Sequence, residues 1–253
     1  MKIYTLINQK GGVGKTTTAI NLGSCIAAHD KRVLIVDMDP QANATSSLGY
    51  NKNEVRRGTY GVLIGKSSIR DQILRNENFN LSLLPASPSL AGAEIELIEF
   101  EDREKRLAKA LAEVEDLFDY VMIDCPPSLN LLTVNALIAA KNGVIIPVQC
   151  EYLALEGLGQ LTQTINRVKR SYPQVNVRGV VLTMFDGRTK LAVDVVREVR
   201  RYFQDKVFQS IIPRSVRLAE APSYGQPINY YAKSSNAARA YDSLAMEILT
   251  QDI

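Results

Sequence analysis

Residues 8–18, Asn-Gln-Lys-Gly-Gly-Val-Gly-Lys-Thr-Thr-Thr, follow the apolar run 3–7 and constrain the chain more than any other segment. Three glycines allow the backbone to curl and to point its N–H groups at an anion. A helix beginning near Lys15 would add its positive N-terminal end, and Lys15 would place a cation on nucleotide phosphates. The Thr16 hydroxyl would be available to Mg²⁺. The segment therefore predicts a phosphate-binding loop between a strand and a helix, formed by Lys10, Gly11, Gly12, Val13, Gly14, Lys15, Thr16 and Thr17.

Strand and helix patterns alternate along all 253 residues. Apolar runs predict strands at 2–7, 32–36, 79–84, 120–123, 143–148, 177–183 and 207–212. The spacing of apolar residues predicts helices at 15–28, 89–115, 129–140, 155–168, 189–203 and 237–249. This alternation implies an α/β fold, a single domain over 1–253 with a mostly parallel twisted sheet and helices on both faces.

The composition of the chain argues against metal-binding, disulfide-rich and membrane-spanning proteins. The three cysteines are widely spaced, with no Cys-x-x-Cys pair, and there is one histidine, which argues against a zinc site, an iron–sulfur site or a disulfide framework. Reduced thiols fit the cytoplasm. No run approaches 18 apolar residues, so we expect no membrane span. The first predicted strand begins at Lys2, which we expect to leave no room for a signal peptide or a preceding helix-turn-helix.

Three acidic residues follow predicted strands. The run 33–36 ends in Asp37-Met-Asp39-Pro, and the run 120–123 ends in Asp124-Cys-Pro-Pro. Because ligands of open α/β sheets bind at the carboxyl ends of strands, we expect these carboxylates to lie near the phosphate loop. Asp124 would then hold Mg²⁺ through water. The phosphate loop, the Asp-x-Asp segment and the Asp-Pro-Pro segment, in this order along the chain, indicate a nucleotide site more specifically than any one of them does alone.

The loop departs from the common phosphate-loop pattern, because Gln9 stands where that pattern has glycine and a second lysine, Lys10, follows it. This form, Lys-Gly-Gly-x-Gly-Lys-Thr, resembles the deviant Walker A loop of the ParA/MinD ATPases. The resemblance implies ATP and Mg²⁺ as cofactors, Asp37 in the Mg²⁺ shell and Asp39 positioning the attacking water. It also implies a homodimer in which Lys10 reaches the partner's phosphates. The catalytic residues would be Lys10, Lys15 and Asp39, and the metal would be held by Thr16, Asp37 and Asp124.

The resemblance extends nearly to the end of the chain. The segment 212–223, Ile-Pro-Arg-Ser-Val-Arg-Leu-Ala-Glu-Ala-Pro-Ser, is similar to ParA/Soj-type partition ATPases. That likeness implies that Pro213 and Ser215 lie against the adenine, although relatives often carry asparagine at Ser215. It implies that Glu151 lies near the dimer interface and the ribose. A helix-capping role for Glu151 fits the sequence equally well.

Positive charge is concentrated late in the chain, where residues 161–217 hold 12 Lys/Arg against 4 Asp/Glu within a chain of net charge +3. Such a segment is typical of a face that binds an anionic polymer. The resemblance implies non-specific binding of duplex DNA by the ATP dimer. The expected contacts are Arg188, Lys190, Arg197, Arg201 and Arg217. No base-reading motif is evident, so phosphate contacts should dominate.

The predicted function is ATP-dependent DNA partition. A ParB-type centromere-binding partner would stimulate hydrolysis, and the protein would be cytoplasmic and associated with the nucleoid. The alternative is a MinD-like ATPase acting as a spatial positioning switch, which would bind membranes through a basic C-terminal helix. The segment 241–253 contains three acids and no Lys or Arg, which disfavours membrane binding. A further alternative is a switch that binds nucleotide but does not hydrolyse it. A measurement of ATP turnover distinguishes such a switch from an ATPase.

Overall fold

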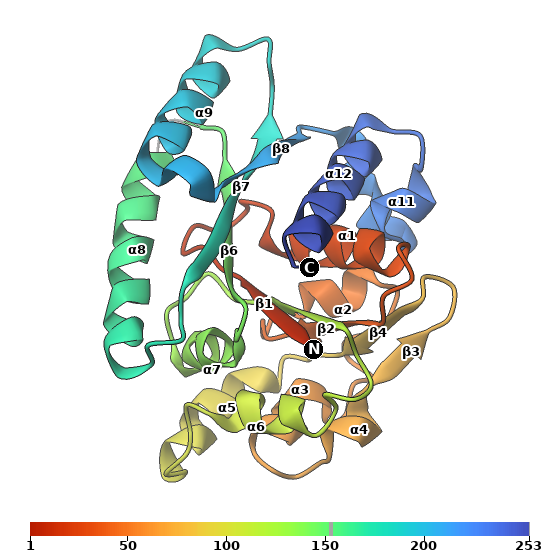
Figure 1. Ribbon diagram of the computed structural model, residues 1–253. Coiled ribbons are helices and arrows are strands. Elements are labelled where there is room, and N and C mark those ends of the chain that lie inside the picture. The colour runs from red at the N-terminus through yellow and green to blue at the C-terminus, as the bar shows by residue number, and fades with distance from the viewer. Residues whose placement is uncertain (152–153, 253) are drawn as a thin grey trace.

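The computed structural model describes residues 1–151 and 154–252. Eight strands form one sheet in the order β3-β4-β2-β5-β1-β6-β7-β8 (Figure 1). The described pairings are parallel except the one between β3 and β4. The strands are β1 Lys2–Leu6, β2 Val33–Asp37, β3 Leu74–Asn76, β4 Leu81–Leu84, β5 Tyr120–Asp124, β6 Gly143–Gln149, β7 Val177–Phe185 and β8 Val207–Pro213. The predicted α/β fold with a mostly parallel sheet is confirmed.

Helices cover both faces of the sheet, as predicted (Figure 1). Helices α1, α11 and α12 pack on one face, α3, α5, α6 and α7 cover part of the other, and α8 and α9 cover the rest of it. The helices are α1 Lys15–Ala27, α2 Asn43–Ser47, α3 Gly58–Leu63, α4 Ile69–Gln72, α5 Leu90–Glu96, α6 Arg106–Ala112, α7 Leu131–Ala139, α8 Ala154–Ser171, α9 Lys190–Phe203, α10 Val216–Glu220, α11 Ile228–Tyr231 and α12 Asn236–Gln251.

The sequence pattern explains this layering. In β1, Tyr4 and Leu6 belong to the core under α1 and α12, whereas Ile3 belongs to the core on the other face. All five residues of β2 are buried, which is why its sequence is an unbroken apolar run rather than an alternating one. Because β1, β2, β5, β6, β7 and β8 run parallel, the segments after their last residues meet along one edge of the sheet.

The single helix predicted over 89–115 is wrong. The segment forms α5, a 3-10 turn at Leu97–Glu99 and the separate helix α6. Phe100 is extended, with φ −95° and ψ 132°, and so ends the first helical part. The side chain of Asn135 in α7 then accepts from Leu107 N–H and donates to Arg103 C=O, which fixes the start of α6. Helical spacing alone did not reveal this tertiary contact.

The C-terminal helix is fastened to the sheet. Tyr241, Leu244 and Ile248 of α12 are buried, and the Tyr4 hydroxyl donates to both carboxylate oxygens of Asp252 at 2.6 and 2.7 Å. Arg178 Nη2 also contacts Asp252 Oδ1, at 3.2 Å. In the described parts of the chain, each helix is too short or too polar to cross a bilayer.

Candidate active site

The phosphate loop follows β1 and ends at α1, as predicted. Gly12 and Gly14 have φ values of 75° and 92°, a region that residues with a Cβ rarely adopt, so glycine is required at both positions. A Cβ added to Gly11 or Gly12 would meet no atom within 4 Å. Both glycines therefore face open space. The first turn of α1 supplies N–H groups that no helical carbonyl satisfies.

Lys15, the first residue of α1, lies in this loop and is only 7% exposed. Its ammonium donates to Lys10 C=O at 3.2 Å. Burial lowers the pKa of Lys15, and the nearby Asp124 carboxylate opposes that shift. A buried ammonium beside a ring of N–H groups is suited to a polyanion, because the anion would replace the water that the lysine has lost.

Asp37 and Asp124 lie side by side at the ends of β2 and β5, where their Cα positions are partners in the parallel ladder. Both are fully buried. Thr16 Oγ1 donates to Asp124 Oδ2 at 2.6 Å, whereas Asp124 Oδ1 has no hydrogen-bond partner among the described residues. Burial, followed by the charge of Asp37, raises the pKa of Asp124 well above its usual value.

Asp37 has partners on both oxygens. Oδ1 accepts from Asp39 N–H at 3.2 Å, and Oδ2 accepts from the N–H and hydroxyl of Thr45 at 2.8 and 2.7 Å. Burial nevertheless raises the pKa of Asp37 to about 6. Two adjacent buried carboxylates, one with an unpartnered oxygen, form a site that a divalent cation would stabilise, and oxygen donors suit Mg²⁺. The donor set therefore fits Mg²⁺.

Asp39 lies two residues after the end of β2 and is 7% exposed. Its Oδ1 accepts from Gln41 N–H at 2.8 Å, which holds the carboxylate in the bend that follows β2. The predicted carboxylates are thus brought to the same edge as the loop. This arrangement is able to hold a metal ion against a phosphate chain and to orient a water molecule.

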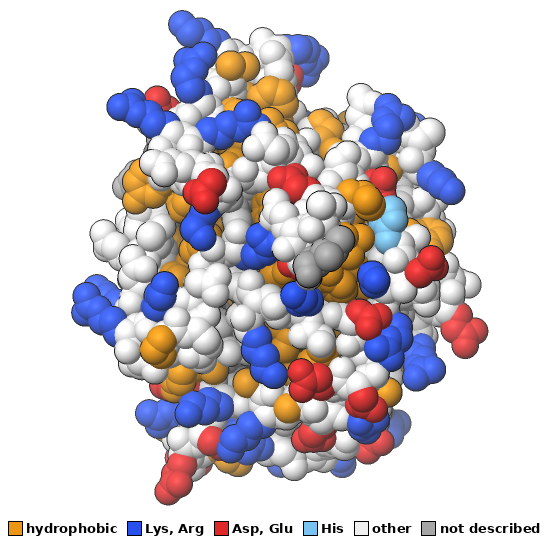
Figure 2. Space-filling model, in the orientation of Figure 1, with side chains coloured by type: hydrophobic (Ala, Val, Ile, Leu, Met, Phe, Trp, Pro, Cys, Tyr) orange, Lys and Arg blue, Asp and Glu red, His pale blue; other side chains and the backbone are white. Residues whose placement is uncertain are grey.

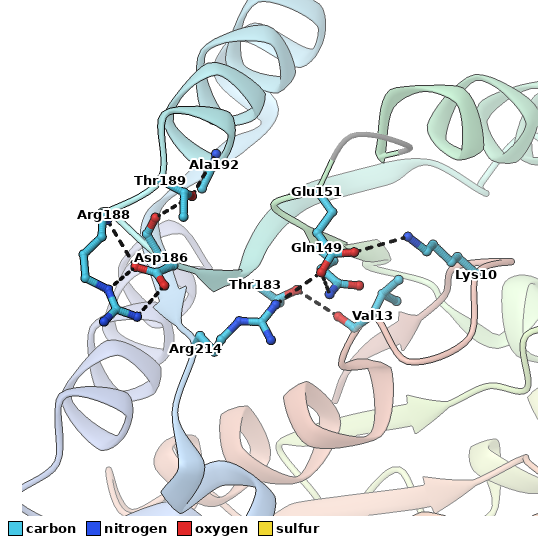
Figure 3. Close-up of polar contacts among 10 residues, drawn as sticks. All are labelled: Lys10, Val13, Gln149, Glu151, Thr183, Asp186, Arg188, Thr189, Ala192 and Arg214. Atoms are coloured by element: carbon cyan, nitrogen blue, oxygen red, sulfur yellow. Dashed lines mark hydrogen bonds and ion pairs between the residues drawn. The ribbon is translucent and has the colours of Figure 1, made fainter.

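A cavity of about 270 Å³ opens beside the loop, between α1 and the segment after β8. Its lining includes Gly14 and Thr17 from the nucleotide side and both predicted base contacts, Pro213 and Ser215. Thr183 in β7 joins the two parts, because its hydroxyl donates to Val13 C=O at 2.8 Å (Figure 3). The cavity is therefore continuous with the loop and has room for a flat base.

Lys10 and Glu151 face each other across the loop (Figure 3). Lys10 Nζ lies 3.9 Å from Glu151 Oε2, and the two side chains are 39% and 45% exposed. Lys10 N–H donates to Asn8 Oδ1 at 3.0 Å, and Asn8 Nδ2 donates to Pro147 C=O at 2.8 Å. The backbone of Lys10 is therefore fixed, whereas its side chain reaches the surface.

Comparison with known proteins agrees with this geometry. The model of an AAA domain family matches residues 1–177. The sporulation initiation inhibitor protein Soj of Bacillus subtilis is 52% identical over 248 residues, covering 98% of each chain. The chromosome-partitioning ATPase Soj of Treponema pallidum is 50% identical over 252 residues, covering 99% of this chain and 98% of that one. This chain belongs to the ParA/Soj family.

A solved structure has the same fold over nearly the whole chain. The Mycobacterium smegmatis protein described as cobyrinic acid a,c-diamide synthase, with bound ADP and magnesium, superposes with a TM-score of 0.88 at 36% identity. The alignment covers 99% of this chain and 95% of that one. The ParA/Soj fold in this chain is therefore matched over the phosphate loop, the carboxylates and the segment after β8 alike.

The predicted DNA contacts of this ParA/Soj-family protein lie on three segments: the turn after β7, helix α9 and helix α10. Lys190, Arg197 and Arg201 are exposed on α9, and Lys and Arg side chains project around that region in Figure 2. Arg188 pairs with Asp186 through Nη2 and Oδ2 at 2.7 Å, and Arg217 in α10 pairs with Glu220 at 2.8 Å. Arg197 pairs with Asp194 at 3.1 Å. Several of these cations thus have a nearby acid, which the charge pattern alone did not reveal.

Sequence reasoning missed the residues that hold the site together. They are Asn8, which holds Lys10; Thr45, which holds Asp37; Thr183, which holds Val13; and Arg214, which contacts Glu151. Only Arg214 carried a usable signal, because it lies between Pro213 and Ser215. The other three act through neighbours distant in sequence or through common polar side chains that have no motif.

Proposed function

We propose that this ParA/Soj-family protein drives DNA partition: ATP closes a homodimer, the dimer binds non-specific double-stranded DNA, and partner-stimulated hydrolysis releases it. Its family makes it an ATPase that uses ATP and Mg²⁺. The observation that carries the proposal is the different placement of the two loop lysines. Lys15 is buried within its own loop, whereas Lys10 reaches the rim with 39% of its side chain exposed. One subunit thus has a second lysine to offer a neighbour.

Within one subunit, the loop N–H groups and Lys15 would bind and orient the phosphates. Mg²⁺, when bound, supplies positive charge against the developing negative charge on the phosphoryl oxygens. Thr16 and Asp124 are the residues to hold it, with Asp37 behind them. Asp39 would orient the attacking water. Because phosphoryl transfer needs positioning and charge neutralisation more than covalent chemistry, these residues suffice for a slow basal reaction.

Lys10 would supply the remaining charge from the partner subunit. A cation that arrives only when two subunits meet makes hydrolysis depend on dimerisation, since negative charge on the transferred phosphoryl needs compensation in the transition state. The same dimer would join two cationic faces. Two weak faces in one body bind a polymer far more tightly than either alone, because the second contact becomes intramolecular.

The DNA-binding face would be formed by Arg188 after β7, by Lys190, Arg197 and Arg201 on α9, and by Arg217 on α10. A partner of the ParB type, bound at centromere-like sites, would stimulate hydrolysis and separate the dimer from DNA. This cycle places the protein at the nucleoid. The support is the cationic surface together with relatives named chromosome-partitioning proteins, including that of Myxococcus xanthus at 48% identity.

The MinD-like alternative is less well supported. A membrane-binding C-terminal helix has to present an apolar face to lipid, but the apolar side of α12 is packed against α1 and β8. Glu247 on α12 also accepts from the N–H groups of Gln209 and Ser210, at 2.8 and 3.1 Å. The helix would have to leave the body of the protein before it could insert.

Turnover of ATP tests the proposal directly. We expect hydrolysis to be slow alone, to rise with DNA or partner and to rise most with both together. Lys10→Ala should retain ATP binding but lose dimer formation or stimulated turnover. If ATP turnover did not change with DNA or partner, and the protein bound anionic vesicles in the presence of ATP, the MinD-like positioning switch would be favoured instead.

A further inference from the structure

Glu151 lies between the phosphate loop and the segment after β8, and its two carboxylate oxygens have different partners (Figure 3). Oε1 accepts from Gln149 Nε2 at 2.6 Å and from Arg214 Nη2 at 3.2 Å. Oε2 faces Lys10 Nζ at 3.9 Å. Two donors thus hold one oxygen and leave the other directed at the lysine.

The positions of both donors are set by the sheet. Gln149 is the last residue of β6, and Arg214 follows β8, where its N–H donates to Phe185 C=O at 2.9 Å. Arg214 also lines the cavity beside the loop, next to Pro213 and Ser215. The residue that holds Glu151 is therefore within reach of a ligand in that cavity. Lys10 is connected through Glu151 to the same segment.

We propose that Glu151 is a latch that retains Lys10 in its own subunit, and that Arg214 is the positioning residue that holds the latch. The inference rests on the proposed function, in which Lys10 moves to the partner's phosphates. Each subunit then has two arrangements: Lys10 on Glu151 before the dimer closes, and Lys10 on the partner's nucleotide afterwards. The latch disfavours an early or nucleotide-free association, because Lys10 has to exchange one anion for another.

The exposure of the pair sets the size of the effect. Lys10, Glu151 and Arg214 side chains are 39%, 45% and 58% exposed, so water screens their charges. Exposed ion pairs shift an equilibrium by up to roughly five-fold. Such a latch is weak enough for a triphosphate to displace and strong enough to move the ATP concentration at which dimers form.

Zero-length carbodiimide cross-linking reports the latch, because it joins a lysine to a carboxylate only when the two are in contact. We expect a Lys10–Glu151 cross-link within one subunit in the nucleotide-free protein and its loss in the ATP-bound dimer. Lys141 and Glu115, 3.8 Å apart and half exposed, form a matched control pair that should cross-link equally in both states. Mixed-isotope dimers separate cross-links within a chain from those between chains.

Variants then test the consequence. In an Asp39→Ala background, which should accumulate the ATP dimer, Glu151→Gln should lower the ATP concentration for half-dimerisation by roughly two- to five-fold. Arg214→Gln should act in the same direction but less, and should also reduce the Lys10–Glu151 cross-link. Glu115→Gln should change neither.

The outcomes separate the latch from the proposed function. If Lys10 and Glu151 cross-link equally within one chain with and without ATP, or if Glu151→Gln leaves or raises the ATP midpoint, the latch is overturned while the partition ATPase stands. If the Asp39→Ala protein forms no dimer at any ATP concentration, the dimer proposal itself fails, and the latch fails with it.

Discussion

Two charged regions of this protein differ in how their charges are held. In the nucleotide site, Lys15, Asp37 and Asp124 are at most 7% exposed, and burial shifts the pKa of each. At the face near α9, Arg188 is 88% exposed and Arg197 is 70% exposed, and each pairs with an acid two or three residues away. In the nucleotide site, water cannot replace a partner that a charged group loses. At the face near α9, it can.

This difference predicts how each region responds to substitution. A buried charge that loses its partner is costly, because no solvent compensates it. An exposed charge contributes little alone and acts through the sum of many contacts with a polymer. Single changes should therefore abolish activity in the nucleotide site and should only weaken binding on the outer face.

The largest effect is expected at Lys15. Lys15→Gln should reduce ATP affinity by at least about a hundred-fold, because the phosphates lose a charged contact in a desolvated loop. Isothermal titration with ATP measures this, and thermal unfolding without nucleotide checks that the variant is folded. Lys141→Gln, at an exposed lysine, should bind ATP as the parent does. Near-parental affinity in Lys15→Gln would remove Lys15 from the proposed site.

A smaller but still large effect is expected at Asp39. Asp39→Ala should retain ATP and lower turnover by roughly two to four orders of magnitude, because the lost carboxylate orients water rather than nucleotide. The variant should accumulate as an ATP-bound dimer by size exclusion with light scattering. A monomeric ATP complex, or normal turnover, would contradict the role assigned to Asp39.

The sequence indicated where the loop and its carboxylates lie more fully than it indicated the side-chain contacts of the outer face, for a physical reason. A phosphate loop is a local structure, so the glycines and lysines at 10–15 specify it without help from the rest of the chain. Asp37 and Asp124 were also predictable, because strand ends share one edge of a parallel sheet. The contacts of Thr45, Thr183 and Arg214 depend on tertiary packing, and so does the break in the helix predicted at 89–115.

On the outer face, where the charges are exposed to water, we expect smaller effects from single substitutions. Arg188→Glu and Arg217→Glu should each weaken duplex binding by the ATP form roughly ten-fold or more and equally for all sequences, without changing ATP turnover in the absence of DNA. Each dimer loses two phosphate contacts, so the slope of log affinity against log salt should fall by about two.

A matched arginine lies at the opposite edge of the sheet, where the parallel strands begin. Arg32 precedes β2 and pairs with Asp119 at 2.9 Å, much as Arg188 pairs with Asp186. Arg32→Glu should therefore leave DNA binding unchanged. Two results would show that the face with Arg188 and Arg217 is an ordinary charged surface. One is equal affinity for duplex DNA with ADP and with ATP, and the other is unchanged DNA binding in both charge reversals.

The smallest functional effect is expected where burial and charge occur far from the site. Tyr4 is fully buried, and its hydroxyl holds Asp252 beside Arg178. Tyr4→Phe removes those hydrogen bonds and should lower the free energy of unfolding by about 1–3 kcal/mol, because the Asp252 carboxylate loses a donor. ATP affinity, turnover and DNA binding should stay at parental values, since α12 remains packed through its apolar side. Urea unfolding beside the three functional assays measures this contrast. A loss of activity without a loss of stability would mean that the end of α12 is coupled to the nucleotide site. The buried Tyr4–Asp252 contact would then serve function as well as stability.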